Sequence, residues 1–296
     1  MLTQNQFDFF CRAIADFGVK HVIIRQHDRE IFRHHFEPEA PCGQFSITKS
    51  FTGTAVGFAV EEGLFALEDR VIDLFPDEAP KNPSPQWQAL TVKHLLTMQM
   101  GFDRQYLMGY QRKTMKETDW VDFVFRQPMP DYPGRYFKYS NAGPYLAGIL
   151  VERTSGEELI DYLMPRLLEP LGIARPEWGR DPLGHVFGAS DMVMTTEEVS
   201  RFGQLYLDRG RWKGEQILPP AWVKKVWDTT ISTEEGQNDY SLLFWRGRYD
   251  SICSVGRNGQ YCSLVPEKDL VVTINSFDTT NENLMEYVWT YLYPHL

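Results

Sequence analysis

This 296-residue sequence has little of what marks several other classes of protein. No apolar run approaches the roughly 20 residues that a membrane-spanning helix needs, and cysteine occurs only 4 times. Cationic side chains are in the minority, with 30 Lys and Arg against 40 Asp and Glu, for a net charge of −10. The attraction that draws proteins onto nucleic acids or anionic lipid is therefore missing. We expect neither nucleic acid nor a membrane as a partner.

The sequence also shows no metal-binding pattern, and we expect no export signal. Residues 1–8 contain neither a basic nor an apolar stretch, so we expect a cytoplasmic protein whose cysteines are free thiols. The cysteine spacing does not suit zinc, and the adjacent His34 and His35 would face opposite sides of a strand. We expect no metal and no cofactor, and the sequence leaves the oligomeric state open.

What the sequence does contain is material for a large folded core. Hydrophobic residues make up 43% and charged residues 24%, which are ordinary globular values. Apolar periodicity and turn residues place strands near both chain ends and helices at the ends and through the middle. The predicted helices cover 4–17, 46–64, 92–98, 120–125, 144–153, 157–168, 196–206 and 283–293, and the predicted strands cover 19–25, 30–36, 242–249, 261–265 and 270–275.

These elements predict an α+β fold. Both chain ends contribute to one antiparallel sheet with flanking helices, and a mainly helical subdomain is inserted in the middle. Residues 1–75 and 191–296 are predicted to form the α/β subdomain, and residues 76–190 the helical one. A site is expected where the two subdomains meet.

The clearest local pattern is Ser46-Ile47-Thr48-Lys49, at the start of a helix predicted to be buried. One helical turn places the Ser46 hydroxyl and the Lys49 amine on the same face. A serine becomes a nucleophile when a base takes its proton, and a desolvated lysine can lose its own proton near neutral pH. Taken alone, the pattern is weak evidence, because many Ser-x-x-Lys pairs lie on a solvated helix surface.

Two further side chains lie in a loop bounded by Gly and Pro. Tyr139 and Asn141 are two residues apart and precede a predicted helix. The phenol can relay protons if nearby cations lower its pKa, and the amide can bond both a lysine and a substrate carbonyl. The alternative is a tyrosine packed under a turn, followed by an asparagine that caps the helix.

A third segment, residues 254–261, combines Arg257 with Gly259 at the start of a late strand. Because glycine allows close backbone approach, the main-chain N–H of Gln260 can face an acyl oxygen together with that of Ser46, as an oxyanion hole. The alternative is a plain hairpin turn with a solvated arginine.

The order of these three patterns resembles the serine β-lactamase and penicillin-binding-protein superfamily. The resemblance is to its class C β-lactamase, D-alanyl-D-alanine carboxypeptidase and esterase branch, and it covers most of the chain. The flanks of the motifs are similar to that family as well. These flanks are residues 45–51, 90–97, 133–141, 201–207 and 265–272.

The resemblance implies an acyl-enzyme mechanism. Ser46 would attack an ester, amide or lactam carbonyl, and Lys49 and Tyr139 would share the base and acid roles. Asn141 would position Lys49 and bind the substrate. Which of Lys49 and Tyr139 holds the proton at rest is a property of the coupled pair.

The third segment departs from the family pattern. The family usually has lysine or histidine where this chain has Arg257, and a hydroxyl or small residue where it has Asn258. Arginine does not shuttle protons, but it can hold a substrate carboxylate or lower the pKa of Tyr139. Arg257, Gly259 and Gln260 are predicted to bind the substrate.

The leading hypothesis is a serine hydrolase that acts through an acyl-enzyme on a small ester, amide or peptide. The altered third segment points away from cell-wall-like substrates. The alternative is a catalytically silent binding protein that keeps this fold and its pocket.

Overall fold

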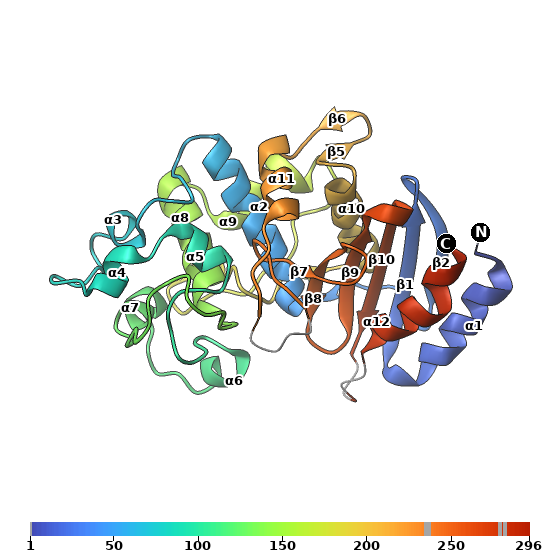
Figure 1. The fold of residues 1–296 in the computed structure, drawn as a ribbon, viewed down its shortest axis with the longest axis horizontal. Coiled ribbons are helices and arrows are strands. Elements are labelled where there is room, and N and C mark those ends of the chain that lie inside the picture. Colours follow the sequence, from blue (N-terminus) through green and yellow to red (C-terminus); the bar gives the residue numbers. More distant parts are fainter. Residues whose placement is uncertain (1, 234–237, 278–279, 281–282) are drawn as a thin grey trace.

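The computed structural model describes residues 2–233, 238–277, 280 and 283–296. Within these residues, strands from both chain ends form one antiparallel sheet in the order β2-β1-β10-β9-β8-β7 (Figure 1). The strands are β1 (Val19–Gln26), β2 (Arg29–His35), β7 (Trp245–Arg246), β8 (Ile252–Gly256), β9 (Gln260–Val265) and β10 (Leu270–Ser276).

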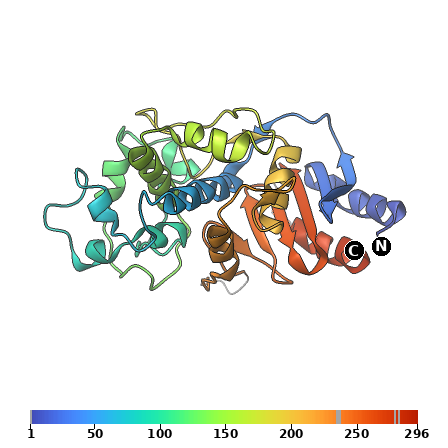
Figure 2. The same ribbon diagram turned by 90° about the horizontal axis from the view of Figure 1, so that it is seen from above.

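Helices cover both faces of this sheet, as the two perpendicular views show (Figures 1 and 2). Alternate residues of β10 point to opposite sides, so Val271 enters one hydrophobic cluster and Val272 the other. The Val272 side packs against α1 (Gln4–Ile14) and α12 (Leu284–Tyr287). The Val271 side packs against α10 (Thr196–Leu207).

The middle of the chain forms a mainly helical lobe beside the sheet (Figure 1, left). Its helices are short except for α8, because proline-rich loops interrupt them. They are α3 (Val71–Leu74), α4 (Pro85–Ala89), α5 (Val92–Leu96), α6 (Gly109–Arg112), α7 (Trp120–Phe125), α8 (Ala142–Ser155) and α9 (Leu159–Leu163).

Helix α2 (Thr48–Glu61) joins the two parts of the molecule. It packs against α8 and α9 of the helical lobe and against β8 of the sheet. Every residue from Thr48 to Ala59 is buried, which is typical of a helix in the interior of a large core. The first turn of α2 therefore lies where the helical lobe and the sheet meet.

Smaller elements complete the chain. The two-residue strands β3 (Cys42–Gly43) and β4 (Val193–Met194) pair with each other, as do β5 (Arg211–Trp212) and β6 (Glu215–Gln216). Helix α11 (Pro220–Asp228) packs on α2. The β3–β4 pair fixes the segment that leads into α2.

The predicted α+β class is confirmed, with sheet strands from both chain ends around a helical insertion. The strand predicted over 242–249 is wrong for most of its length. Leu242, Leu243 and Phe244 are buried in the core between the lobes, and Leu243 N donates to Leu96 O at 3.0 Å, so only Trp245–Arg246 remains a strand. The strand β8 was not predicted, and the subdomain boundaries at 75/76 and 190/191 stay a prediction.

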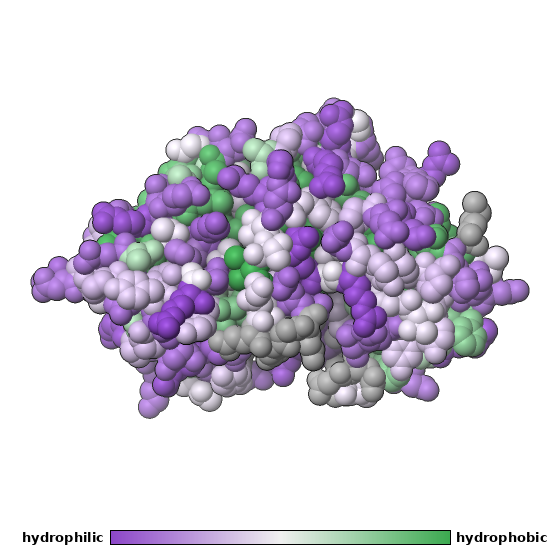
Figure 3. Space-filling view, in the orientation of Figure 1, coloured by the Kyte–Doolittle hydropathy of each residue, from purple (hydrophilic) through white to green (hydrophobic). Residues whose placement is uncertain are grey.

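The surface is mainly polar. Figure 3 shows hydrophilic residues over most of one face, with hydrophobic residues scattered among them. In the part of the chain that the structure describes, no helix combines the length and apolar character needed to cross a membrane.

Candidate active site

Ser46 and Lys49 lie at the N-terminal end of α2, which the chain enters through a short 3-10 turn at Phe45–Ile47. Phe45 has a left-handed φ of 36°, an unfavourable conformation that recurs at functional sites. The Lys49 amine donates to Ser46 Oγ at 2.8 Å and to the Ala189 carbonyl at 2.7 Å. Lys49 is buried and Ser46 is partly exposed, so a ligand can reach the hydroxyl.

The environment of Lys49 favours the neutral amine. Burial lowers its pKa to about 7, because the ammonium is deprived of water. The positive charge of Arg112 lowers the pKa further, and the negative charge of Asp191 opposes both effects. An amine near half-protonation at neutral pH, bonded to a hydroxyl, can act as a general base.

Tyr139 contacts both of these groups. Its phenol is hydrogen-bonded to Ser46, and its ring centroid lies 5.1 Å from Lys49 Nζ. Burial raises the pKa of Tyr139 to about 12, although the bond to Ser46 opposes this. The ring stacks on Trp245 with centroids 5.6 Å apart. At neutral pH the phenol is therefore protonated and can donate.

Asn141 has an amide oxygen with no assigned partner. Its Nδ2 donates to Leu107 O at 2.9 Å, whereas Oδ1 is buried and accepts no hydrogen bond from the described residues. The side chain makes no capping bond to α8, although Asn141 precedes that helix. A buried acceptor without a donor is costly, so Oδ1 is open to a further N–H donor. The predicted contact of Asn141 with Lys49 is not among the hydrogen bonds of either side chain, because the Lys49 amine bonds Ser46 and Ala189 instead.

The third predicted segment forms the turn between β8 and β9. Arg257 is exposed at the turn, and no hydrogen bond or ion pair joins it to the rest of the described chain. Asn258 and Gly259 take left-handed φ values of 64° and 78°. The buried Gln260 side chain donates to the carbonyl of Gly43 at 2.9 Å, so it holds the segment that precedes Ser46 in place. A role of these residues in substrate binding stays a prediction.

Val255 lies on β8 at an edge of the sheet, and no role was predicted for it from the sequence. The main-chain groups of Ser251 are hydrogen-bonded to Gly247 and Arg248, which follow β7. Because main-chain groups alternate in direction along a strand, the N–H and C=O of Val255 point toward the same edge as those of Ser251. Because β7 pairs with β8 only as far as Cys253, this edge is uncovered by β7 at Val255. The adjacent Ser254 bonds Ser50 of α2 at 2.8 Å, so the open edge lies beside the helix that carries Ser46.

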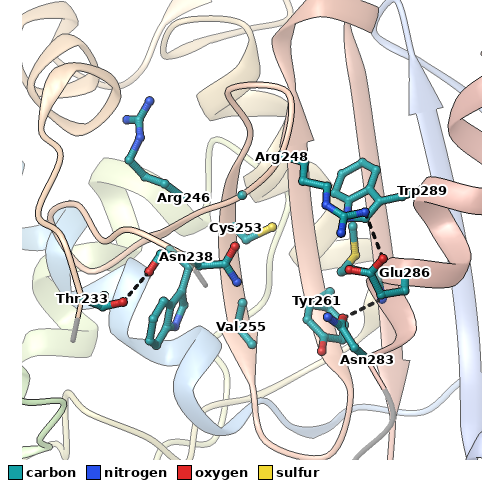
Figure 4. A pocket seen from close by; sticks show the side chains of 13 residues that line it. Thr233, Asn238, Arg246, Arg248, Cys253, Val255, Tyr261, Asn283, Glu286 and Trp289 are labelled. Atoms are coloured by element: carbon teal, nitrogen blue, oxygen red, sulfur yellow. Dashed lines mark hydrogen bonds and ion pairs between the residues drawn. The ribbon is translucent and has the colours of Figure 1, made fainter. Parts of the chain in front are cut away.

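A cavity of about 650 Å³ lies beside β7, β8 and β9. Figure 4 shows Cys253, Val255 and Tyr261 on the strands and the ion-paired Arg248 and Glu286 across from them. Trp245 lines this cavity and also stacks on Tyr139, so it connects the cavity to the Ser46 site. The lining is completed by Thr233, Asn238, Arg246, Gly247, Asn283, Met285 and Trp289.

The structure thus brings Ser46, Lys49 and Tyr139 into contact. Ala189, Arg112 and Asp191 surround them without having been assigned a role from the sequence. No pattern in the sequence singles out Ala189 or Asp191, and nothing local distinguishes Arg112 from the other arginines of the chain.

Comparison with known proteins identifies the family of the chain. A family model described as Beta-lactamase matches residues 21–292. The 6-aminohexanoate-dimer hydrolase of Paenarthrobacter ureafaciens is 23% identical over 269 residues, which are 82% of this chain and 68% of that protein. Protein flp of Staphylococcus aureus is 22% identical over 84% of this chain, which spans little more than half (56%) of that relative.

The fold is also that of solved structures. The octameric penicillin-binding protein homologue from Pyrococcus abyssi superposes with a TM-score of 0.78 at 20% identity. The match covers 98% of this chain and 77% of that one. At this level of identity the likeness establishes the fold alone.

Proposed function

The chain belongs to the Beta-lactamase family and is a hydrolase at that level of description, and from this premise we propose that it is a serine acyl hydrolase. The observation that carries the proposal is the 2.8 Å bond between the buried Lys49 amine and the partly exposed Ser46 hydroxyl. A base with a pKa of about 7 at that distance can take the hydroxyl proton as the oxygen attacks.

In the acylation step, Ser46 Oγ bonds to the carbonyl carbon of an ester or amide while its proton passes to Lys49 Nζ. The negative charge that develops on the carbonyl oxygen needs N–H donors, and the N–H of Ser46 is one candidate. For the second donor we propose Val255 at the open edge of β8 in place of Gln260, because Gln260 pairs with Gly256 inside the sheet. Tyr139 donates its phenolic proton to the leaving group as the bond to the carbonyl carbon breaks. The Lys49 proton then restores the phenol.

In the second step, water releases the acyl group. Lys49 is neutral again at this stage and takes a proton from the water that attacks the acyl-enzyme carbonyl. Lys49 passes that proton to Ser46 Oγ as the bond between Oγ and the acyl carbon breaks, so the free carboxylic acid and the starting enzyme are formed. No other co-reactant is required.

We propose a small ester, amide or peptide as the substrate. A relative named as a hydrolase of the 6-aminohexanoate dimer makes a linear amide a specific candidate. The cavity beside Trp245 is large enough for a side chain or leaving group beyond the reacting carbonyl. A small-molecule partner and a cytoplasmic location are parts of this proposal.

Covalent labelling tests the proposal directly. A fluorophosphonate probe followed by peptide mass spectrometry should give an adduct on Ser46 and none in Ser46→Ala. That variant should cleave p-nitrophenyl acetate at the uncatalysed rate while its melting temperature stays nearly unchanged. A folded wild-type protein without adduct or turnover would instead support the alternative, a silent binding protein of this fold.

A further inference from the structure

The loop at 187–192 determines the position of the Lys49 amine. Its Ala189 carbonyl accepts from Lys49 Nζ at 2.7 Å. Thr52 donates to the carbonyl just before Ala189 at 2.6 Å, and Thr48 accepts from a main-chain N–H of the same loop at 3.3 Å. The loop is therefore docked along one side of α2 by three hydrogen bonds.

Arg112 holds the other side of this loop. Its Nη1 donates to Asp191 Oδ2 at 2.7 Å, and its guanidinium carbon lies 4.0 Å from the ring centroid of Phe187. Because Arg112 belongs to α6, its two contacts join the helical lobe to the loop. The ion pair lies two residues from the carbonyl that accepts the Lys49 amine.

Several local features around this pair are unfavourable. Asp191 has a left-handed φ of 74°, which is uncommon for a residue other than glycine. A Cβ at Gly179 would lie 2.8 Å from the Asp191 Cβ, so the neighbouring chain has room for Asp191 only because glycine stands there. Arg112 Nε is buried without a partner among the described residues. Strained backbone and unpaired buried polar atoms of this kind cluster at functional sites.

We propose that Arg112 and Asp191 are positioning residues that tune the Lys49 base. The guanidinium favours the neutral amine, the carboxylate favours the ammonium, and together they hold the Ala189 carbonyl on Nζ. This inference rests on the proposed function, because it concerns the base of the same reaction. Neither residue touches the reacting atoms.

Arg112 and Asp191 are the main charges that act on the Lys49 amine, because the groups in contact with it are uncharged. Ser46 from the turn before α2 and Tyr139 from the segment before α8 contact it, and both are neutral at neutral pH. From the sheet, β8 presents the uncharged Ser254 to α2. Arg112 and Asp191 act in opposite senses on the amine.

The opposite signs make the inference testable. Without the Arg112 charge the pKa of Lys49 should rise, and without the Asp191 charge it should fall. Arg112→Met keeps an unbranched chain on Phe187, and Asp191→Asn keeps a residue that tolerates a left-handed φ. The double variant removes both charges, so its Lys49 should titrate near the wild-type midpoint.

The experiment compares pH profiles of kcat/KM for p-nitrophenyl acetate in the wild type, both single variants and the double variant. The acid limb should move up by about half a pH unit or more in Arg112→Met and down by a similar amount in Asp191→Asn. Arg112→Lys should restore most of the wild-type midpoint. Melting temperatures identify any variant that fails to fold, and Arg112→Gln then takes the place of Arg112→Met.

A second readout does not depend on turnover. The ε-carbon of lysine labelled with ¹³C reports each amine by NMR, and the signal lost in Lys49→Met identifies Lys49. If the proposed function is wrong, the wild type will be inactive but Lys49 will still titrate in the NMR experiment. The titration midpoints of Lys49 in the Arg112 and Asp191 variants then still test this inference. Midpoints that move in the same direction in both folded single variants, or in neither, would overturn the inference.

Discussion

The two ends of α2 bury the same kinds of polar side chain in different states of hydrogen bonding. From the middle of α2 toward its C-terminal end, Tyr206 shares a 2.7 Å bond with Thr54 and accepts from the Trp222 indole at 3.0 Å. Thr54 in turn donates to a main-chain carbonyl at 2.8 Å, so each of these groups has a partner. Among the residues predicted to work with Ser46 and Lys49 at the N-terminal end, Asn141 has an Oδ1 that lacks a partner among the described residues.

This difference distinguishes the structural part of the helix from the part that is a candidate for catalysis. Both ends contain a tyrosine whose pKa burial raises, Tyr139 and Tyr206, so a shifted phenol does not by itself mark a site. A satisfied network fixes the core and leaves nothing for a ligand to bond. The N-terminal end instead has a buried amine that can change charge, and the predicted site residue Asn141 has a buried acceptor without a partner among the described residues.

Replacing the amine should sharpen the comparison most. In Lys49→Met we expect kcat/KM for p-nitrophenyl acetate to fall by about 10³-fold or more, because the general base is lost. The same variant should be more stable at neutral pH. The folded-state pKa of about 7 lies below the ordinary 10.5, so burial of the ammonium lowers the stability by its full amount below about pH 7.

That cost disappears as the pH rises from about 7 to 10.5, where the unfolded chain also releases its proton. The stability gained by Lys49→Met should be on the order of a few kcal/mol near pH 6 and should shrink toward pH 10. Urea unfolding at several pH values measures it. A gain that does not depend on pH would show that Lys49 is not desolvated as described.

The two tyrosines give the next largest contrast. Tyr139→Phe removes the proposed proton donor and should lower kcat/KM by about 10²-fold, with little change in melting temperature. Tyr206→Phe should leave the rate per folded molecule within about 2-fold but lower the free energy of unfolding by about 1–3 kcal/mol, because Thr54 and Trp222 each lose a partner. Equal kinetic effects in the two variants would remove the distinction between the two ends.

Much of the fold follows from local sequence because its elements carry their own signals. The helix predicted over 4–17 is confirmed as α1 followed by one 3-10 turn that ends at the left-handed Gly18. The early hairpin and the last two sheet strands are confirmed as well. The strand predicted over 242–249 was wrong at Leu242–Phe244, because a short apolar run buried in the core has the same sequence pattern as a buried strand.

The candidate site divides in the same way. Ser46 and Lys49 are one turn apart, so their contact follows from helix geometry alone. Tyr139 joins them through the order of motifs shared with a family. Arg112 and Asp191 lie 79 residues apart and meet only through tertiary packing, which single-sequence periodicity does not encode.

Two glycines extend the comparison to packing alone. A Cβ at Gly57 would overlap the Trp222 ring in the satisfied network, so Gly57→Ala should lower the free energy of unfolding by about 1–3 kcal/mol. Gly43, close to Ser46, has nothing within 4 Å of an added Cβ, so Gly43→Ala is the matched control and should be nearly neutral. Thermal melts of both variants measure the difference, and a destabilised Gly43→Ala would mean that the site end is packed as tightly as the other.

The smallest effect is expected at Arg257, which lies outside both hydrogen-bonded ends of α2. Its side chain is exposed and makes no ion pair within the described chain, so Arg257→Lys should change neither stability nor the rate with p-nitrophenyl acetate by more than about 2-fold. If the guanidinium holds a substrate carboxylate in bidentate fashion, lysine should still raise KM for an ester with a free carboxylate, such as a p-nitrophenyl succinate monoester. The ratio of kcat/KM for the acidic and neutral esters isolates that role, because general damage to the site lowers both. An unchanged ratio would remove Arg257 from substrate recognition and leave it as a residue of the β8–β9 turn.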